Sequence, residues 1–187
     1  MAQKINGEKV KKAIQQSIPL AIKSYTPPHE TEQNLEENHG EFRRELGQDG
    51  LKDRVAYCMK ELTVNAKKAN TKRVYFKEKG LDISDPDDYA EGMKTFKEET
   101  LSNIDHYLQL QKDAGLYIKV VFHARKETFT LSIRNNTEIS RKEQMRVYDR
   151  IARSRAFETM EEALSTVLDD SEGAGLGIVI LVLMLKK

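Results

Sequence analysis

The sequence predicts a mixed α/β protein, and three patterns support that fold class. The clearest is a helix over Leu51 to Ala69, where apolar side chains recur at helical spacing and form one stripe. The second is a pair of strands, Leu116 to Ala124 and Thr128 to Arg134, whose short polar connection is typical of a hairpin. The third is a glycine-rich segment, Gly173 to Gly177, which leads into an apolar, helix-like run.

The residues before Leu51 divide into an apolar part and a polar part. An apolar residue recurs every four positions at Val10, Ile14, Ile18 and Ile22, which predicts an amphipathic helix that ends near Pro19 or by Pro27-Pro28 at the latest. The segment from Thr26 to Gly50 is polar and rich in Glu, Asn and Gln. We therefore expect residues 1–50 to be an N-terminal helical and polar extension.

Three further elements are expected downstream. Arg73 to Phe76 is predicted to be a short strand with Val74 and Phe76 facing one way. Residues 82–115 are predicted to be an inserted helix that begins at the N-cap Asp85 and stops at Gly115. Ile139 to Ile151 is predicted to be helical.

The composition indicates which binding partners and which cellular compartment to expect. The chain has 187 residues, and its 31 basic and 30 acidic side chains nearly cancel, so no overall field favours nucleic acid or an anionic membrane. Its single cysteine, Cys58, cannot form an intrachain disulfide, which fits the reducing cytoplasm. The longest apolar stretch, Ile178 to Leu185, is too short for a helix that spans a bilayer. We expect a cytoplasmic protein without a membrane span and without a nucleic-acid partner.

The first motif that could carry chemistry lies within the clearest helix. Glu61, Asn65 and Lys68 are spaced four and three residues apart, so a helix places them along one edge. The amide oxygen of Asn65 could bind Mg²⁺, which prefers oxygen ligands. Glu61 could take a proton or hold a metal-bound water, and Lys68 could contact a phosphate. A polar edge on an ordinary amphipathic helix is the competing explanation.

The second motif is the glycine-rich segment at the start of the C-terminal helix. Gly173, Gly175 and Gly177 would let backbone N–H groups approach a phosphate, which a helix N-terminus also attracts. Leu176 would pack inward and fix the turn.

Together, and in this order, the two motifs resemble the N-box and the second glycine box of GHKL ATPases, most closely the catalytic ATP-binding domain of bacterial sensor histidine kinases. Between these boxes the family has a strand that ends in an Asp-x-Gly-x-Gly box for adenine. The matching segment here, Leu131 to Ile139, has Asn135 in place of the Asp and Thr137 in place of the first glycine. An Asn carbonyl can still accept a hydrogen bond from the adenine amino group.

The resemblance implies a fold and a division of the chain. The fold would be a two-layer α/β sandwich, with a mixed, mainly antiparallel sheet and helices on one face. Residues 51–187 would form the ATP-binding domain, with 82–115 as an insertion and 152–172 as the ATP lid. Arg153 and Arg155 could approach the phosphates when the lid closes.

The resemblance also implies ATP and Mg²⁺ as cofactors and a role for each site residue. Asn65 would hold Mg²⁺, Glu61 would act as the base, and Lys68 would contact phosphate. Asn135 and Thr137 would lie at the adenine. The phosphates would meet the second glycine box, namely Gly173, Gly175, Leu176 and Gly177.

The expected function is transfer of phosphate from ATP to a protein histidine in two-component signalling. None of the four histidines, His29, His39, His106 and His123, resembles an acceptor box. We therefore expect the acceptor to lie outside this chain, with a phospho-acceptor protein or a response regulator as partner and a second copy of the chain as a further candidate. The alternatives are an anti-sigma-factor-like serine kinase and a degenerate GHKL module that binds a protein.

Overall fold

The computed structural model describes residues 7–25, 52–125, 128–159, 161–163, 165 and 176–185. The chain divides into two compact units, Met1–Thr137 and Glu138–Lys187. The first unit combines helices with a three-stranded antiparallel sheet, whereas the described part of the second unit is helical. The expectation of a mixed α/β fold is thereby confirmed.

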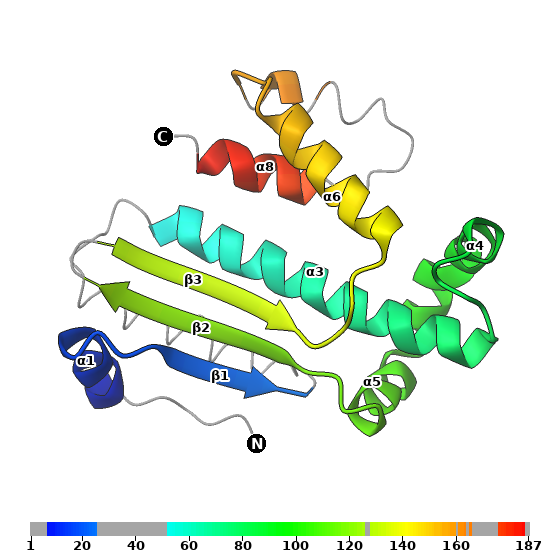
Figure 1. Ribbon diagram of the computed structural model, residues 1–187, viewed down its shortest axis with the longest axis horizontal. Helices are drawn as coiled ribbons and strands as arrows, with labels where there is room; N and C mark the ends of the chain where they lie inside the picture. The colour runs from blue at the N-terminus through cyan, green and yellow to red at the C-terminus, as the bar shows by residue number, and fades with distance from the viewer. Residues whose placement is uncertain are drawn as a thin grey trace. The chain divides into compact units, whose positions relative to one another are not determined.

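The sheet has the strand order β1-β2-β3, with β1 at Leu20–Ser24, β2 at Ile118–Arg125 and β3 at Thr128–Asn135 (Figure 1). Strands β2 and β3 are the predicted hairpin. Strand β1 was not predicted, because the apolar spacing up to Ile22 favoured a helix. In the structure, α1 (Gly7–Gln15) ends before Pro19, and Ile22 lies in the strand.

The strand register separates an apolar face from a basic one. Ile22, Val120 and Ile133 stand opposite one another and therefore share a face. This inner face packs on α1 and on α3 (Lys52–Lys79), and the buried cluster includes Val10 from α1 and Met59 from α3. The packing helices therefore cover one face of the sheet, as expected for two layers.

The opposite, outer face of the sheet is mostly polar, and its basic residues are exposed. Its basic side chains are Lys23, Lys119, Arg125 and Arg134, and the register places Lys23, Lys119 and Arg134 in one cross-strand row. The other outer positions hold Ala21, Val121, His123, Thr128, Thr130 and Ser132. This face of the three strands therefore carries no acidic residue.

Helix α3 is longer than the predicted helix and takes in the segment predicted to be a strand. The prediction of a strand at Arg73 to Phe76 is wrong. Val74, Tyr75 and Phe76 are all buried, since this half of α3 packs against α4 (Pro86–Ser102) and α5 (Ile104–Asp113). A helix covered on several sides buries consecutive residues, so the alternation that suggests a strand is absent.

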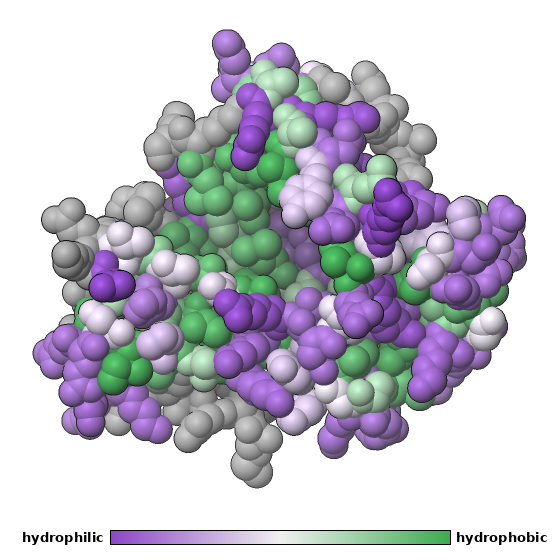
Figure 2. All heavy atoms as spheres, in the orientation of Figure 1, coloured by the Kyte–Doolittle hydropathy of each residue, from purple (hydrophilic) through white to green (hydrophobic). Residues whose placement is uncertain are grey.

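The inserted segment at 82–115 is two helices and not the one expected. Asp85 caps α4 as predicted, because its Oδ1 accepts hydrogen bonds from the backbone N–H groups of Asp87 and Asp88. The chain breaks at Asn103, where φ is −130° and ψ is 45°. The visible face of α4 is mostly hydrophilic (Figure 2). Its inner face includes Gly92, where an added Cβ would lie 2.7 Å from Cζ of Phe76.

The same hydrogen-bond pattern ends three helices of the first unit. At the end of α3, the backbone N–H of Leu81 donates to Phe76 and that of Gly80 donates to Lys77, at 2.9 and 3.2 Å. This Schellman arrangement needs a left-handed residue, and Gly80 has φ of 68°. Gly115 supplies the same conformation after α5, and Ser17 supplies it after α1.

The second unit contains α6 (Arg141–Ser154) and α8 (Leu176–Met184). Helix α6 confirms the helix predicted over Ile139 to Ile151 and begins with a capping box between Ser140 and Glu143. Among the described residues of this unit, Ala163 and Val179 are buried together, and Phe157 and Leu183 pack against them. Among the described residues, no helix is long and apolar enough to cross a membrane.

Candidate functional site

The polar edge predicted on the clearest helix is present on α3. Asn65 Nδ2 donates a hydrogen bond to Glu61 Oε1 at 3.2 Å, so these two side chains lie together one turn apart. Both are half-buried, and Lys68 is exposed. Because the amide nitrogen of Asn65 faces Glu61, its amide oxygen is the atom left for a cation.

A second polar group lies where β3 ends. Asn135 is the last residue of β3 and stands opposite Ile118 on the inner face of the sheet. Its Nδ2 donates to Asn70 Oδ1 at 3.2 Å and to Thr137 Oγ1 at 2.6 Å. The hydroxyl of Thr137 also lies 3.5 Å from Asn70 Oδ1. These side chains form one connected cluster, which we call the Asn70 cluster (Asn70, Asn135 and Thr137).

Asn70 connects this cluster to the backbone before β2. Only 1% of Asn70 is exposed, and its Nδ2 donates to the carbonyl oxygen of Tyr117 at 3.4 Å. The neighbouring Asn136 accepts from the N–H of Tyr117 at 2.7 Å and donates to the carbonyl of Gly115 at 3.1 Å. The turn after β3 is therefore held by asparagine side chains.

Helix α3 carries both polar groups. Asn65 and Asn70 are five residues apart, which corresponds to about 7.5 Å along the helix axis. Asn70 points at the sheet, whereas Asn65 lies on the flank of the helix, since five residues turn through about 140°. No hydrogen bond or ion pair given by the structure joins the Glu61–Asn65 pair to the Asn70 cluster directly.

Asn70 is the functional candidate that the motif analysis missed. It is the first residue after the predicted helix and lies four residues after Ala66, which packs against the core of the sheet. A polar residue at a core position needs a partner, because burying an unpaired amide is costly. An asparagine at a core position of the helix was therefore the feature of the sequence that could have identified Asn70. Gln111 is a comparable case, 2% exposed and bonded through Nε2 to Thr71 Oγ1 at 3.1 Å.

The second glycine motif is described only in part. Gly173 and Gly175 lie outside the described residues, and Gly177 lies within the first turn of α8. Of Leu176, only the helical backbone is described. The helix predicted after the glycines is present, and the phosphate-binding turn before it stays a prediction.

The expected lid, 152–172, overlaps the end of α6. Residues 160, 164 and 166–172 lie outside the described part of the chain. Arg153 is exposed and pairs with Asp149 through Nε at 2.9 Å, and Arg155 is the C-cap of α6. A role of either arginine at a phosphate stays a prediction.

The histidines in the described ranges have structural partners. His106 Nε2 lies 2.6 Å from Glu78 Oε1, and His123 Nε2 lies 3.1 Å from the carbonyl oxygen of Ser17. His29 and His39 lie outside the described residues. The described part of the chain holds no group of three or more His, Cys, Asp or Glu side chains that could bind a metal.

Comparison with known proteins gives one relative to report. An uncharacterized protein of Treponema pallidum (strain Nichols) is 49% identical to this chain over 183 residues. The similarity covers 98% of this chain and 36% of the relative, so the chain spans about a third of the relative's length. No protein-family model and no solved structure matches the chain.

Proposed function

We propose that this chain contains a GHKL-type domain that binds Mg²⁺-ATP and transfers phosphate to a protein histidine supplied from outside the chain. The observation that carries the proposal is the arrangement on α3. This one helix presents the Glu61–Asn65 pair with Lys68 and, about 7.5 Å further along its axis, Asn70, to which the end of β3 is bonded. Both halves of the expected nucleotide site therefore depend on a single rigid element.

The side-chain chemistry fits the cofactors. The free amide oxygen of Asn65 is a suitable ligand for Mg²⁺, which binds few protein groups and completes its shell with phosphate oxygens and water. Bound Mg²⁺-ATP would supply the phosphoryl group. Lys68 is exposed and can reach a phosphate as a point charge. Glu61, held beside Asn65, can accept the proton of an attacking imidazole.

The fold is compatible with this proposal. Helices on one face of an antiparallel sheet make two layers, and the GHKL type adds further strands beyond the second glycine box. In this assignment Asn135 and Thr137 would lie at the adenine.

A second candidate function is a degenerate module that binds a partner protein without ATP. One observation favours it: the amide nitrogen of Asn135 bonds to Asn70 and Thr137, so part of the adenine box serves the interior of the domain.

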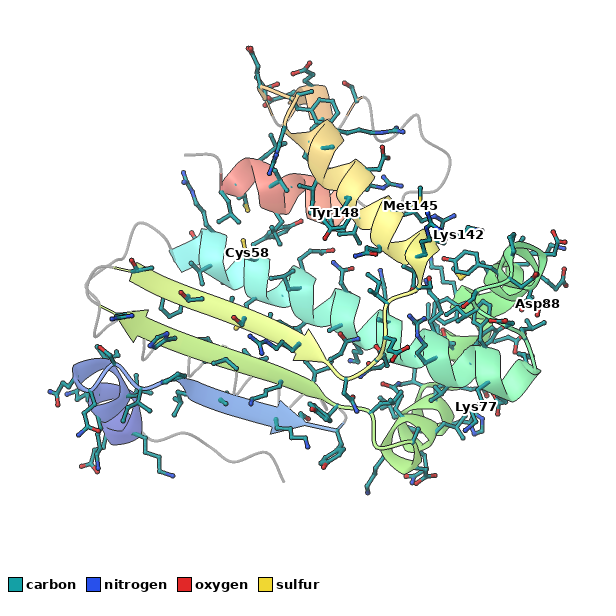
Figure 3. The ribbon with its side chains drawn as sticks, viewed as in Figure 1. Cys58, Lys77, Asp88, Lys142, Met145 and Tyr148 are labelled. Carbon is teal, nitrogen blue, oxygen red and sulfur yellow. The ribbon has the colours of Figure 1, made fainter. Side chains whose placement is uncertain are left out.

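Titration calorimetry of Mg²⁺-ATP decides between the two candidates. We expect wild-type protein to bind, Asn65→Ala to abolish binding, and Lys68→Ala to weaken it about ten-fold through loss of one charge-assisted contact. Lys77→Ala is the matched control, because Lys77 is an exposed lysine near the end of the same helix (Figure 3). It lies nine residues after Lys68, which corresponds to about 180° around the helix. Absence of heat from folded wild-type protein would exclude the nucleotide site and favour the protein-binding module.

A further inference from the structure

The orientation of the Asn135 side chain is determined by its neighbours. Both hydrogen bonds that the structure gives this side chain are donated by Nδ2, to Asn70 at 3.2 Å and to Thr137 at 2.6 Å. The two N–H groups of the amide are thus used. Oδ1 of Asn135 has no hydrogen-bond partner among the described residues.

A backbone carbonyl determines which atoms of the Asn70 cluster donate hydrogen bonds and which accept them. The carbonyl of Tyr117 can only accept, so the Asn70 side chain turns its nitrogen to Tyr117 and its oxygen to Asn135. A flipped Asn135 amide would bring its oxygen against the oxygen of Asn70. Two facing acceptors in a buried site repel, and Asn70 is only 1% exposed, so water cannot relieve the conflict.

An asparagine held in this way behaves as a pure acceptor. An asparagine amide that can rotate freely can either donate or accept a hydrogen bond. It would therefore pair equally well with a base edge that donates and with one that accepts. Adenine presents an amino donor at N6, whereas guanine presents the acceptor O6 at the corresponding place. An Asn135 that offers only its oxygen would therefore pair with adenine and oppose guanine.

We propose that Asn70 and Thr137 are positioning residues that orient the Asn135 amide, so that the site selects adenine over guanine nucleotides although it lacks a carboxylate. This inference rests on the proposed nucleotide-binding function. It assigns to Asn70 and Thr137 a role in specificity that does not require either side chain to touch the base.

The experiment compares Mg²⁺-ATP and Mg²⁺-GTP by titration calorimetry on the 187-residue chain. Wild-type protein is expected to prefer ATP. Thr137→Val removes one of the two acceptors that hold the amide and should reduce the ATP-to-GTP affinity ratio about five-fold, the equivalent of one hydrogen bond. Thr130→Val is the matched control, since Thr130 lies exposed on the outer face of the same strand and its substitution should leave the ratio unchanged.

A rescue variant separates positioning from general structural damage. Asn135→Asp is an acceptor in every orientation, and Asn70→Ala removes the oxygen that would face it. Asn70→Ala alone is expected to reduce the ratio as Thr137→Val does, and the double variant with Asn135→Asp should regain the preference for ATP, with urea unfolding confirming that each variant is folded. These results together would support the inference.

Two different failures can be told apart. If folded wild-type protein binds neither nucleotide, the proposed function fails and the inference fails with it. If wild-type protein binds ATP but shows no preference over GTP, or if Thr137→Val leaves the ratio unchanged, the inference is overturned while the nucleotide site stands.

Discussion

Two threonines on α3 should respond in opposite directions to the same substitution. Thr63 is 4% exposed, and its Oγ1 has no hydrogen-bond partner among the described residues. A buried hydroxyl without a partner costs about 1–3 kcal/mol, and valine replaces it with a methyl group of similar shape and similar helix propensity. Thr63→Val is therefore expected to stabilise the protein by about 1–2 kcal/mol.

Thr71 provides the matched control on the same helix. Its hydroxyl donates to the carbonyl of Lys67 at 3.0 Å and accepts from Gln111 Nε2 at 3.1 Å. Because Gln111 is 2% exposed, Thr71→Val would leave a buried amide N–H unpaired and should destabilise the protein by about 1–3 kcal/mol.

Urea unfolding followed by circular dichroism measures both effects. With an m-value of about 2 kcal/mol per M, the midpoint of Thr63→Val should rise by about 0.5–1 M, and that of Thr71→Val should fall by about 0.5–1.5 M. A midpoint for Thr63→Val at or below that of the wild type would refute the reasoning, since the hydroxyl would then have a partner such as bound water.

Three further predictions concern single side chains. Cys58 lies in the first half of α3 (Figure 3) and is 7% exposed. Burial raises the pKa of its thiol, so a thiol reagent should label it slowly in native protein and rapidly in urea; equal rates would contradict this. The hydrogen bond with His106 lowers the pKa of Glu78 below its ordinary 4.5, so the stability that this carboxylate adds is present above that pH and is lost as the pH falls through its lower folded pKa. The difference in unfolding free energy between wild type and Glu78→Gln should therefore shrink as the pH falls below about 4.5, and a constant difference would argue against the pair. Gly80→Ala should cost about 1 kcal/mol in urea unfolding, because the left-handed φ of 68° is unfavourable for alanine although nothing lies within 4 Å of its Cβ; a neutral result would mean that the end of α3 rearranges.

The parts of the fold that sequence patterns could predict are those with one exposed and one buried side. The hairpin of β2 and β3 alternates between a buried inner face and a more exposed outer face, and the first half of α3 has one side packed on the sheet. The second half of α3 was misread because α4 and α5, which follow it in the chain, fold back and cover it, and local periodicity carries no information about such packing. Tyr75 and Phe76 are adjacent yet both buried, and only the packing of α4 and α5 explains that.

The sequence could predict which side chains of α3 belong to the candidate site, but not which hydrogen bonds link them to the sheet. Glu61, Asn65 and Lys68 follow from helical spacing alone, which acts over one or two turns. The bond between Asn70 and Asn135 spans 65 positions in the chain, and helical or strand periodicity carries no information about such a pair. The glycine motif predicted a helix, which is present as α8, while Gly173 and Gly175 lie outside the described residues.

The row of Lys23, Lys119 and Arg134 across the outer face of the sheet has a consequence for behaviour in solution. Like charges directly opposite on neighbouring strands repel, and salt screens that repulsion within about 10 Å at 0.1 M. The sheet should therefore gain stability from added salt, where a protein held by surface ion pairs would lose it. The same charges oppose face-to-face stacking of two sheets, so crowded copies of this chain are discouraged from associating through the sheet face on which none of the described helices packs.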